Sequence, residues 1–177
     1  KKWNRSVNTR LMGVCARTGE TLWSQESGYW ATYGPPDVFV IDGIVWCDNS
    51  SNGRSDGTVI GYDLQTGKVQ HRFPADQTSY WFHHRCYPAK ATEDYLIMSR
   101  TGVEFVDVKT GEWTLHHWVR GACLYGIMPA NGLLYAPMHE CACSADMKLN
   151  GLNAVAAAKA RVPSKIDVTE HLLVKGP

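Results

Sequence analysis

The stretch that decides the fold is GYDLQTGKVQHRF, residues 61–73, where a strand-like apolar segment runs into a Thr-Gly pair and then an aromatic residue. The same arrangement occurs in VCARTGETLW, residues 14–23, and in FVDVKTGEWTLHHW, residues 105–118. Before each pair, alternating apolar and polar residues predict a strand with two different faces. The glycine permits the positive φ of a tight hairpin turn. Each copy is therefore predicted to be a β-hairpin.

The glycines of the three pairs, Gly19, Gly67 and Gly111, are 48 and then 44 residues apart. A strand-based repeat of about 40–50 residues is typical of the blades of a β-propeller. The alternative is three unrelated hairpins of an all-β sandwich, in which turn signals also recur.

A second set of hairpins lies between the Thr-Gly turns. Its turn dipeptides are Asp42-Gly43, Glu93-Asp94 and Asn131-Gly132. Asp-Gly and Asn-Gly are strong hairpin signals. The 89 residues from Gly43 to Gly132 nearly match the 92 from Gly19 to Gly111. Two independent markers thus keep the same spacing over two blades.

Together the two markers predict an all-β fold, a segment of a β-propeller with two complete four-stranded blades and two partial blades. The complete blades are expected from about Asp37 to Phe73, with a polar loop inserted at 48–57, and from about Ala91 to Trp118. A partial blade at 5–23 precedes them, and another begins near Gly126 and reaches its third strand at about 149–156. Propeller rings usually contain four to eight blades. We therefore expect the remaining blades to come from a longer polypeptide or from another chain.

The sequence of the C-terminal part does not follow the pattern of the blades. We assign residues 1–156 to the propeller and 157–177 to a short helical or irregular excursion, or a linker toward the next blade. Across the boundary between the two, residues 154–161 are expected to form a short helix that Pro163 ends.

Composition excludes some classes of partner. The 177 residues are 44% hydrophobic and 20% charged, which is ordinary for a globular domain. A net charge of +1 argues against a broad nucleic-acid surface. No apolar run approaches the ~18–20 residues of a membrane span.

The Thr-Gly motifs GYDLQTGKVQHRF, FVDVKTGEW and VCARTGETLW resemble the repeats of PQQ-like, or quinoprotein-like, β-propellers. More narrowly, the stretches that begin HHRCYPAK and HHWVRGACLYG, together with LVKGP, resemble large exported PQQ-like repeat proteins of planctomycete-type bacteria. The resemblance implies an extracytoplasmic location, periplasmic or secreted. The family includes quinone-dependent dehydrogenases, outer-membrane assembly scaffolds and members of unknown role, so the resemblance predicts fold rather than activity.

The resemblance also implies what a quinone site would need: a disulfide between adjacent cysteines, a stacking Trp and an Asp base near calcium. No Cys-Cys pair occurs, and Cys141-Ala-Cys143 is the nearest approach. No cofactor is therefore evident in this segment, and PQQ or a metal ion would lack a complete site.

Chemically rich residues precede the inner strands of two consecutive blades. They are His83, His84, Arg85 and Tyr87 before one strand, and Arg120 and Tyr125 before the next. As a ligand site, the arginines could hold a carboxylate, and tyrosine or histidine could transfer a proton. The alternative is that these residues recur only as blade-to-blade packing. A further pair, His116-His117 beside Trp118, is expected to face solvent on an outer strand.

Six cysteines suit either of two interpretations. In an exported protein the disulfide candidates are Cys86, Cys123, Cys141 and Cys143, with the connectivity open. Alternatively, His139, Cys141 and Cys143 could hold a metal ion. Cys15 and Cys47 are expected to be buried thiols in strands.

These observations leave three functional classes, in order of preference. The first is a binding or scaffold module for a protein or polysaccharide. The second is a carbohydrate-active enzyme, for example a lyase with an Arg/Tyr/His site at the propeller mouth. The third is part of a quinone- or metal-dependent oxidoreductase.

Overall fold

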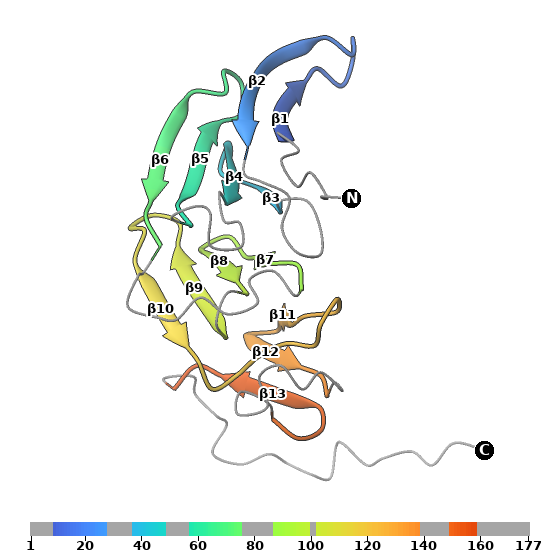
Figure 1. Ribbon diagram of the computed structural model, residues 1–177, viewed down its shortest axis with the longest axis vertical. Helices are drawn as coiled ribbons and strands as arrows, with labels where there is room; N and C mark the ends of the chain where they lie inside the picture. The colour runs from blue at the N-terminus through green and yellow to red at the C-terminus, as the bar shows by residue number, and fades with distance from the viewer. Residues whose placement is uncertain are drawn as a thin grey trace, which may run out of the picture.

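The computed structural model describes residues 9–27, 37–48, 57–75, 87–99, 102–138 and 149–158. All regular secondary structure in these ranges is β-strand (Figure 1). The strands are β1 Thr9–Val14, β2 Thr21–Ser27, β3 Val38–Ile41, β4 Ile44–Asp48, β5 Val59–Asp63, β6 Val69–Phe73, β7 Lys90–Ala91, β8 Tyr95–Met98, β9 Val103–Asp107, β10 Trp113–His116, β11 Met128–Ala130, β12 Leu133–Ala136 and β13 Asn153–Ala156.

The strands form four separate antiparallel sheets in which neighbours in space are neighbours in sequence. The sheets are β1-β2, β3-β4-β5-β6, β7-β8-β9-β10 and β11-β12-β13. A repeated up-and-down sheet of four strands is the blade of a β-propeller. The chain is therefore an all-β propeller segment, and both predicted complete blades are confirmed. Most of the polar loop inserted at 48–57 lies outside the described residues.

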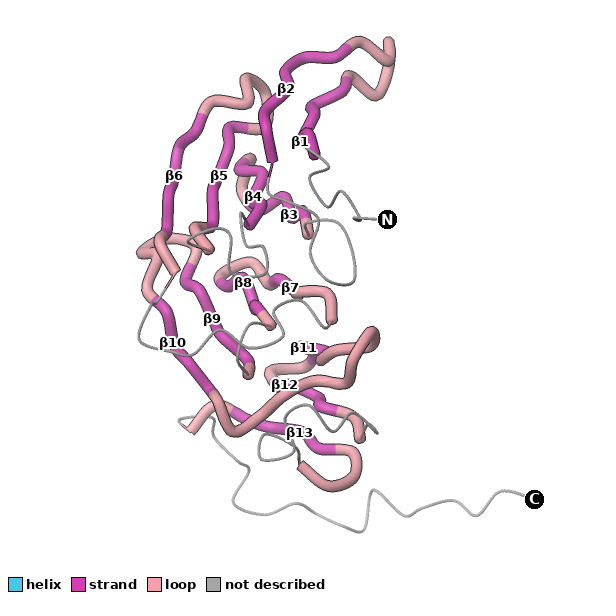
Figure 2. Tube along the Cα trace, viewed as in Figure 1, coloured by secondary structure: helices cyan, strands magenta, loops and turns pink. Residues whose placement is uncertain are grey.

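The sheets follow one another along an arc (Figure 2). The first strands of three consecutive sheets, β3, β7 and β11, lie along its concave side, and the outer strands β6 and β10 lie along its convex side. The inner edge of each of these sheets therefore lies on the concave side, where a propeller has its central channel.

Two of the three predicted hairpin dipeptides, Asp42-Gly43 and Asn131-Gly132, form tight turns with positive φ. Asp42 and Gly43 have φ angles of 49° and 75°, and Asn131 and Gly132 have 51° and 72°. Positive φ at both central residues is the geometry of the type I′ hairpin, which suits the right-handed twist of the flanking strands. The dipeptides thus determine where β3 turns into β4 and β11 into β12.

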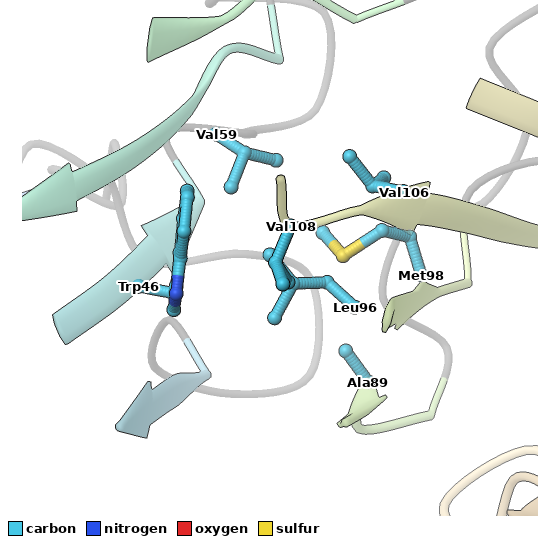
Figure 3. Packing of buried hydrophobic residues seen from close by; sticks show 7 residues of the cluster. All are labelled: Trp46, Val59, Ala89, Leu96, Met98, Val106 and Val108. Carbon is cyan, nitrogen blue, oxygen red and sulfur yellow. The ribbon is translucent and has the colours of Figure 1, made fainter. Parts of the chain in front are cut away.

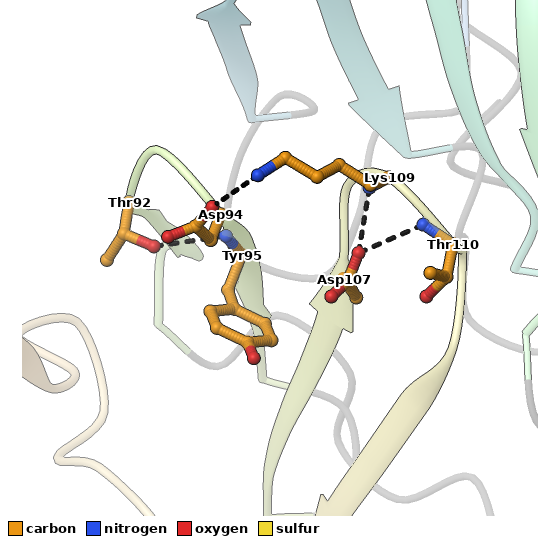
Figure 4. A network of polar contacts seen from close by, with 6 residues as sticks. All are labelled: Thr92, Asp94, Tyr95, Asp107, Lys109 and Thr110. Atoms are coloured by element: carbon orange, nitrogen blue, oxygen red, sulfur yellow. Dashed lines mark hydrogen bonds and ion pairs between the residues drawn. The ribbon is translucent and has the colours of Figure 1, made fainter.

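Two of the three Thr-Gly turns are held by an aspartate at their first position. One carboxylate oxygen of Asp107 accepts hydrogen bonds from the backbone N–H of Lys109 at 2.8 Å and of Thr110 at 2.9 Å (Figure 4). The Thr110 hydroxyl accepts from the N–H of Glu112 at 3.2 Å. Asp63 accepts in the same way from the backbone of Gln65 and Thr66. The repeat is therefore a side-chain-capped turn, and its glycine closes it with positive φ.

This capping gives a pH-dependent prediction. The N–H donors of Thr110 and Lys109 hold the pKa of Asp107 below its ordinary value. A carboxyl whose folded pKa is lowered stabilises the fold above its unfolded pKa, and this contribution is lost as pH falls through the folded pKa. We expect Asp107→Asn to be less stable than the parent chain at neutral pH, with the difference shrinking below about pH 4. Urea unfolding from pH 2 to 7 would measure it, and a pH-independent difference would contradict it.

Aromatic residues of one sheet pack on the turn glycine of the next. The ring of Trp23 lies so close to Gly67 that a Cβ there would meet it at 2.5 Å, and its Nε1 donates to the carbonyl of Leu64 at 2.9 Å. Phe73 lies against Gly111 in the same way, at 2.4 Å from a built Cβ. The glycines of the repeat therefore serve the contact between sheets as well as the turn itself.

The main core lies between the two complete sheets. Its buried members are Trp46, Val59, Ala89, Leu96, Met98, Val106 and Val108 (Figure 3). Half-buried Phe73 and Trp113, from the outer strands β6 and β10, pack against this cluster. The apolar side chains whose alternation predicted the strands thus form the packed interface between consecutive sheets.

Two predictions about strand ends are wrong. Trp118 does not lie on the outer strand, because β10 ends at His116 and residues 117–118 form a turn. A helix does not begin at Ala154, because Asn153–Ala156 pair with β12 as β13, the predicted third strand. Pairing along β12 satisfies the backbone there, so the helix propensity of alanine does not decide the structure. Residues 159–161 and Pro163 lie outside the described residues.

Candidate functional site

The structure joins two of the predicted site residues, Tyr87 and Arg120, into one buried arrangement. Tyr87 is 1% exposed and Arg120 is 3% exposed. The guanidinium carbon of Arg120 lies over the Tyr87 ring, 5.7 Å from its centroid. A cation over an aromatic face is attracted by the ring quadrupole, most strongly where water is excluded. The pair therefore links the segment before β7 to the segment before β11.

Tyr87 is fixed at both ends. Its hydroxyl donates to the carbonyl of Gly102 at 2.8 Å, and its own carbonyl accepts from the hydroxyl of Ser99 at 2.9 Å. Its ring lies under Gly126, where a Cβ would meet the tyrosine Cδ2 at 2.8 Å. Tyr87 thus forms the floor on which the segment before β11 rests.

Above this floor, residues 122–126 form a compact turn. The N–H of Gly126 donates to the carbonyl of Ala122 at 2.6 Å. Leu124 has a φ of 69°, a backbone conformation that residues other than glycine and asparagine rarely adopt. Leu124 is 64% exposed and Tyr125 is 79% exposed. The turn therefore presents a leucine and a tyrosine to the outside from a rigid base.

Tyr87 and Tyr125, which sequence analysis places at equivalent positions, have opposite surroundings. Each lies three residues before the first strand of its sheet, β7 or β11. Yet Tyr87 is buried, whereas Tyr125 is among the most exposed large side chains of the described residues. Tyr87 and Arg120 are thus buried, while the side chain of Tyr125 is exposed to solvent. Ligand binding by the six predicted residues stays a prediction.

Several predicted site residues lie outside the described part of the chain. They are His83, His84, Arg85, Cys86, His139, Cys141 and Cys143. Within the described residues, no group of three or more His, Cys, Asp or Glu side chains could hold a metal ion. The adjacent-cysteine pair that the quinone site of the resembling family requires is missing from the sequence, so we assign no chemistry to that cofactor.

Sequence analysis missed a row of four rings beside this site. Tyr95 and Phe105 meet edge to face at 5.9 Å between ring centroids, Phe105 and His116 at 5.6 Å, and His116 and Trp118 at 6.1 Å. His116 is half-buried in this row, so the expectation that it simply faces solvent is wrong. The available signal was the alternation of Thr114 and His116, which puts both on one face of β10, whereas Trp118 follows in the turn after the strand.

Three of the six cysteines lie in the described residues, and no disulfide joins any two of them. Cys47 is buried in β4 as expected, but Cys15 is half-exposed, contrary to the expectation of a buried thiol. Cys15 begins the first Thr-Gly turn, at the position of Asp63 and Asp107, and its backbone makes the same closing bond to Gly19 at 2.8 Å. A thiol thus replaces the capping carboxylate in that turn.

Hydrogen bonds within the turn favour the thiolate form of Cys15. A hydrogen bond from the Thr18 side chain, followed by backbone donors of Thr18 and Arg17, lowers the pKa of Cys15 below that of an ordinary thiol. Because the thiolate is the nucleophile, we expect Cys15 to be alkylated by iodoacetamide with a pH midpoint below that of a free thiol. The midpoint should rise in Thr18→Ala, as followed by mass spectrometry of the Cys15 peptide. Equal midpoints in the two chains would refute this account.

The fold and this site define a β-propeller segment with a rigidly based, exposed turn. Among solved structures, the chain is similar to the crystal structure of BamB from Moraxella catarrhalis, with 18% sequence identity and a TM-score of 0.48. The match covers 72% of this chain and 36% of that one, so the chain spans about a third of that structure. No family model matches the chain, and no curated protein matches it. The fold assignment rests on the sheets themselves.

A search of the described residues for a helix long and apolar enough to cross a membrane found none.

Proposed function

We propose that the protein is a binding and scaffold module: a PQQ-like β-propeller segment of a larger exported protein that holds a protein partner through the turn at 122–126. The observation that carries this proposal is the exposure of Leu124 and Tyr125 on a turn whose base is buried and hydrogen-bonded. The resemblance of the Thr-Gly motifs supports the PQQ-like assignment and the extracytoplasmic location.

The side chains on and beside the turn favour a protein over a polysaccharide. Tyrosine is enriched among the residues that dominate binding energy at protein interfaces, and methionine is enriched in their cores. Met128, at the start of β11, adds a further exposed apolar side chain beyond the turn. A sugar would use the tyrosine ring but gain little from leucine and methionine. Because the floor under the turn is buried and hydrogen-bonded, we expect the backbone at Tyr125 to lose little conformational freedom when a partner covers it.

A photo-crosslinking experiment tests the proposal. Benzoylphenylalanine replaces Tyr125 in the chain produced in its native host, and adducts are identified by mass spectrometry. Leu22 on β2 is also an exposed apolar side chain and serves as the control position. We expect a discrete protein adduct at position 125 that is absent at position 22 and lost when Leu124→Ser is added. Identical adduct patterns at the two positions would contradict the proposal.

A second measurement separates the two kinds of partner. Affinity electrophoresis through gels that contain neutral or acidic polysaccharide should leave the migration of the chain unchanged. Retardation that Tyr125→Ala abolishes would assign the turn to a polysaccharide instead. The thermal unfolding midpoint of each variant is measured first, and we expect it to be unaltered because both side chains are exposed.

A further inference from the structure

A wide apolar cleft lies between the β7–β10 sheet and the β11–β13 sheet. Its volume is about 760 Å³. Phe105, His116 and Trp118 line one side, and Val155 and Ala156 of β13 line the other. The floor includes Val103, which belongs to the buried cluster between the two sheets, so the cleft continues an existing sheet-to-sheet interface.

The corresponding place between the two complete sheets is filled. There, Phe73 is opposite Val59 in the β5–β6 register, and Trp113 of the next outer strand packs against the same cluster. In the following sheet, His116 is opposite Val103 in the β9–β10 register, so His116 takes the place of Phe73. Within the described residues no outer strand packs over His116. The cleft is therefore the space that the outer strand of the β11–β13 sheet would fill.

Strand β13 has an edge ready for such a strand. It pairs with β12 on one side, from Ala136 opposite Asn153 to Leu133 opposite Ala156. On its other side no described strand pairs with it. An unpaired edge presents a row of N–H and C=O groups that can bind an extended segment.

We propose that residues 166–169 of this chain bind along β13 as the fourth strand of its sheet and place Ile166 and Val168 in the cleft. The sequence Ile-Asp-Val-Thr alternates apolar and polar side chains, which suits a strand with one face in an apolar cleft and the other in solvent. Nineteen residues, 159–177, come after the described end of this sheet at position 158, which itself lines the cleft.

The connection to this strand is longer than in the other sheets. By register, Ala156 takes the place of Asp63 and Asp107, because all three are opposite the residue that follows a hairpin turn. The capping carboxylate is thus missing, and Ala160 stands where the turn glycine would be. These residues lack the two features, carboxylate cap and turn glycine, that stabilise the tight turns after Asp63 and Asp107, whereas residues 157–165 are long enough to cross the ~4.8 Å between strands.

Hydrogen exchange on the full chain tests the pairing. The β13 amides that point away from β12 should be protected in the parent chain. Val168→Asp should lower their protection at least tenfold while leaving β9 unchanged, because a carboxylate enters the apolar cleft. Thr169→Asp changes the opposite face and should leave protection as in the parent. Unprotected β13 amides in the parent chain, or equal effects of the two variants, would overturn the proposal.

Crosslinking identifies the source of the strand. Benzoylphenylalanine at Thr114, which lines the cleft, should form an adduct with a peptide from 159–177 of the same molecule. The same probe at exposed Val69 on β6 should not. An equal mixture of light and ¹⁵N-labelled chains separates adducts within one molecule from those between two. Adducts between copies, or adducts that exclude 159–177, would show another occupant and refute the assignment.

Discussion

Gly111→Ala is expected to destabilise the chain far more than the same change at Gly132. Both glycines have positive φ, 74° and 72°, so both substitutions force alanine into the left-handed region at a cost of about 1–2 kcal/mol. At Gly132 nothing lies within 4 Å of the added Cβ. At Gly111 the Cβ would meet Phe73 at 2.4 Å, and relieving such a clash typically costs about 1–3 kcal/mol more.

Chemical denaturation of both variants measures the difference. Adding Phe73→Leu to Gly111→Ala should recover part of the loss, since the ring is then gone from the contact, whereas adding it to Gly132→Ala should only weaken the core further. Equal losses for the two alanine variants would mean that the aromatic contact with the turn glycine does not stabilise the joint between sheets.

The second large effect is expected at Tyr87. Tyr87→Ala removes the floor under the exposed turn and leaves a cavity, so we expect a loss of about 3–5 kcal/mol. Tyr87→Phe keeps the ring and removes only the hydrogen bond to the carbonyl of Gly102, so we expect about 1–2 kcal/mol. The free energy of unfolding of each variant provides the measurement.

The two substitutions at Tyr87 also separate structure from recognition. Tyr87→Phe should leave the adduct at position 125 intact, because the ring still supports Gly126. Loss of that adduct in Tyr87→Phe, with the fold preserved, would show that the buried hydroxyl takes part in binding. The tyrosine would then do more than support the turn.

Local sequence signals predicted the strands and turns well, because the interactions behind them are local. Asp42-Gly43 and Asn131-Gly132 form the expected hairpins, since few residues accept the φ values of 49° and 51° that precede the glycines. The Thr-Gly repeat predicted the turns that follow Asp63 and Asp107, although not their carboxylate caps, which accept from donors only two and three residues away.

The candidate site was harder to predict, because equivalent positions in a repeat need not have equivalent surroundings. Tyr87 and Tyr125 share a register, yet one lies beneath Gly126 and the other points outward. The cleft beside His116 is lined by residues of two different sheets. Its existence could not be predicted from the sequence of either sheet alone. Helix propensity misled at Ala154, since pairing with Tyr135 of β12 outweighs it.

The contacts of Trp23 with Gly67 and of Phe73 with Gly111 have a mechanical consequence. Each ties a sheet to the next one only, so stability is shared between nearest neighbours rather than across the whole arc. A chain pulled from its two ends would therefore yield one sheet at a time, beginning with the two-stranded β1–β2 sheet, which has the fewest strands to release. A force–extension trace would show separate rips, with β3–β6 and β7–β10 holding longest behind their shared core.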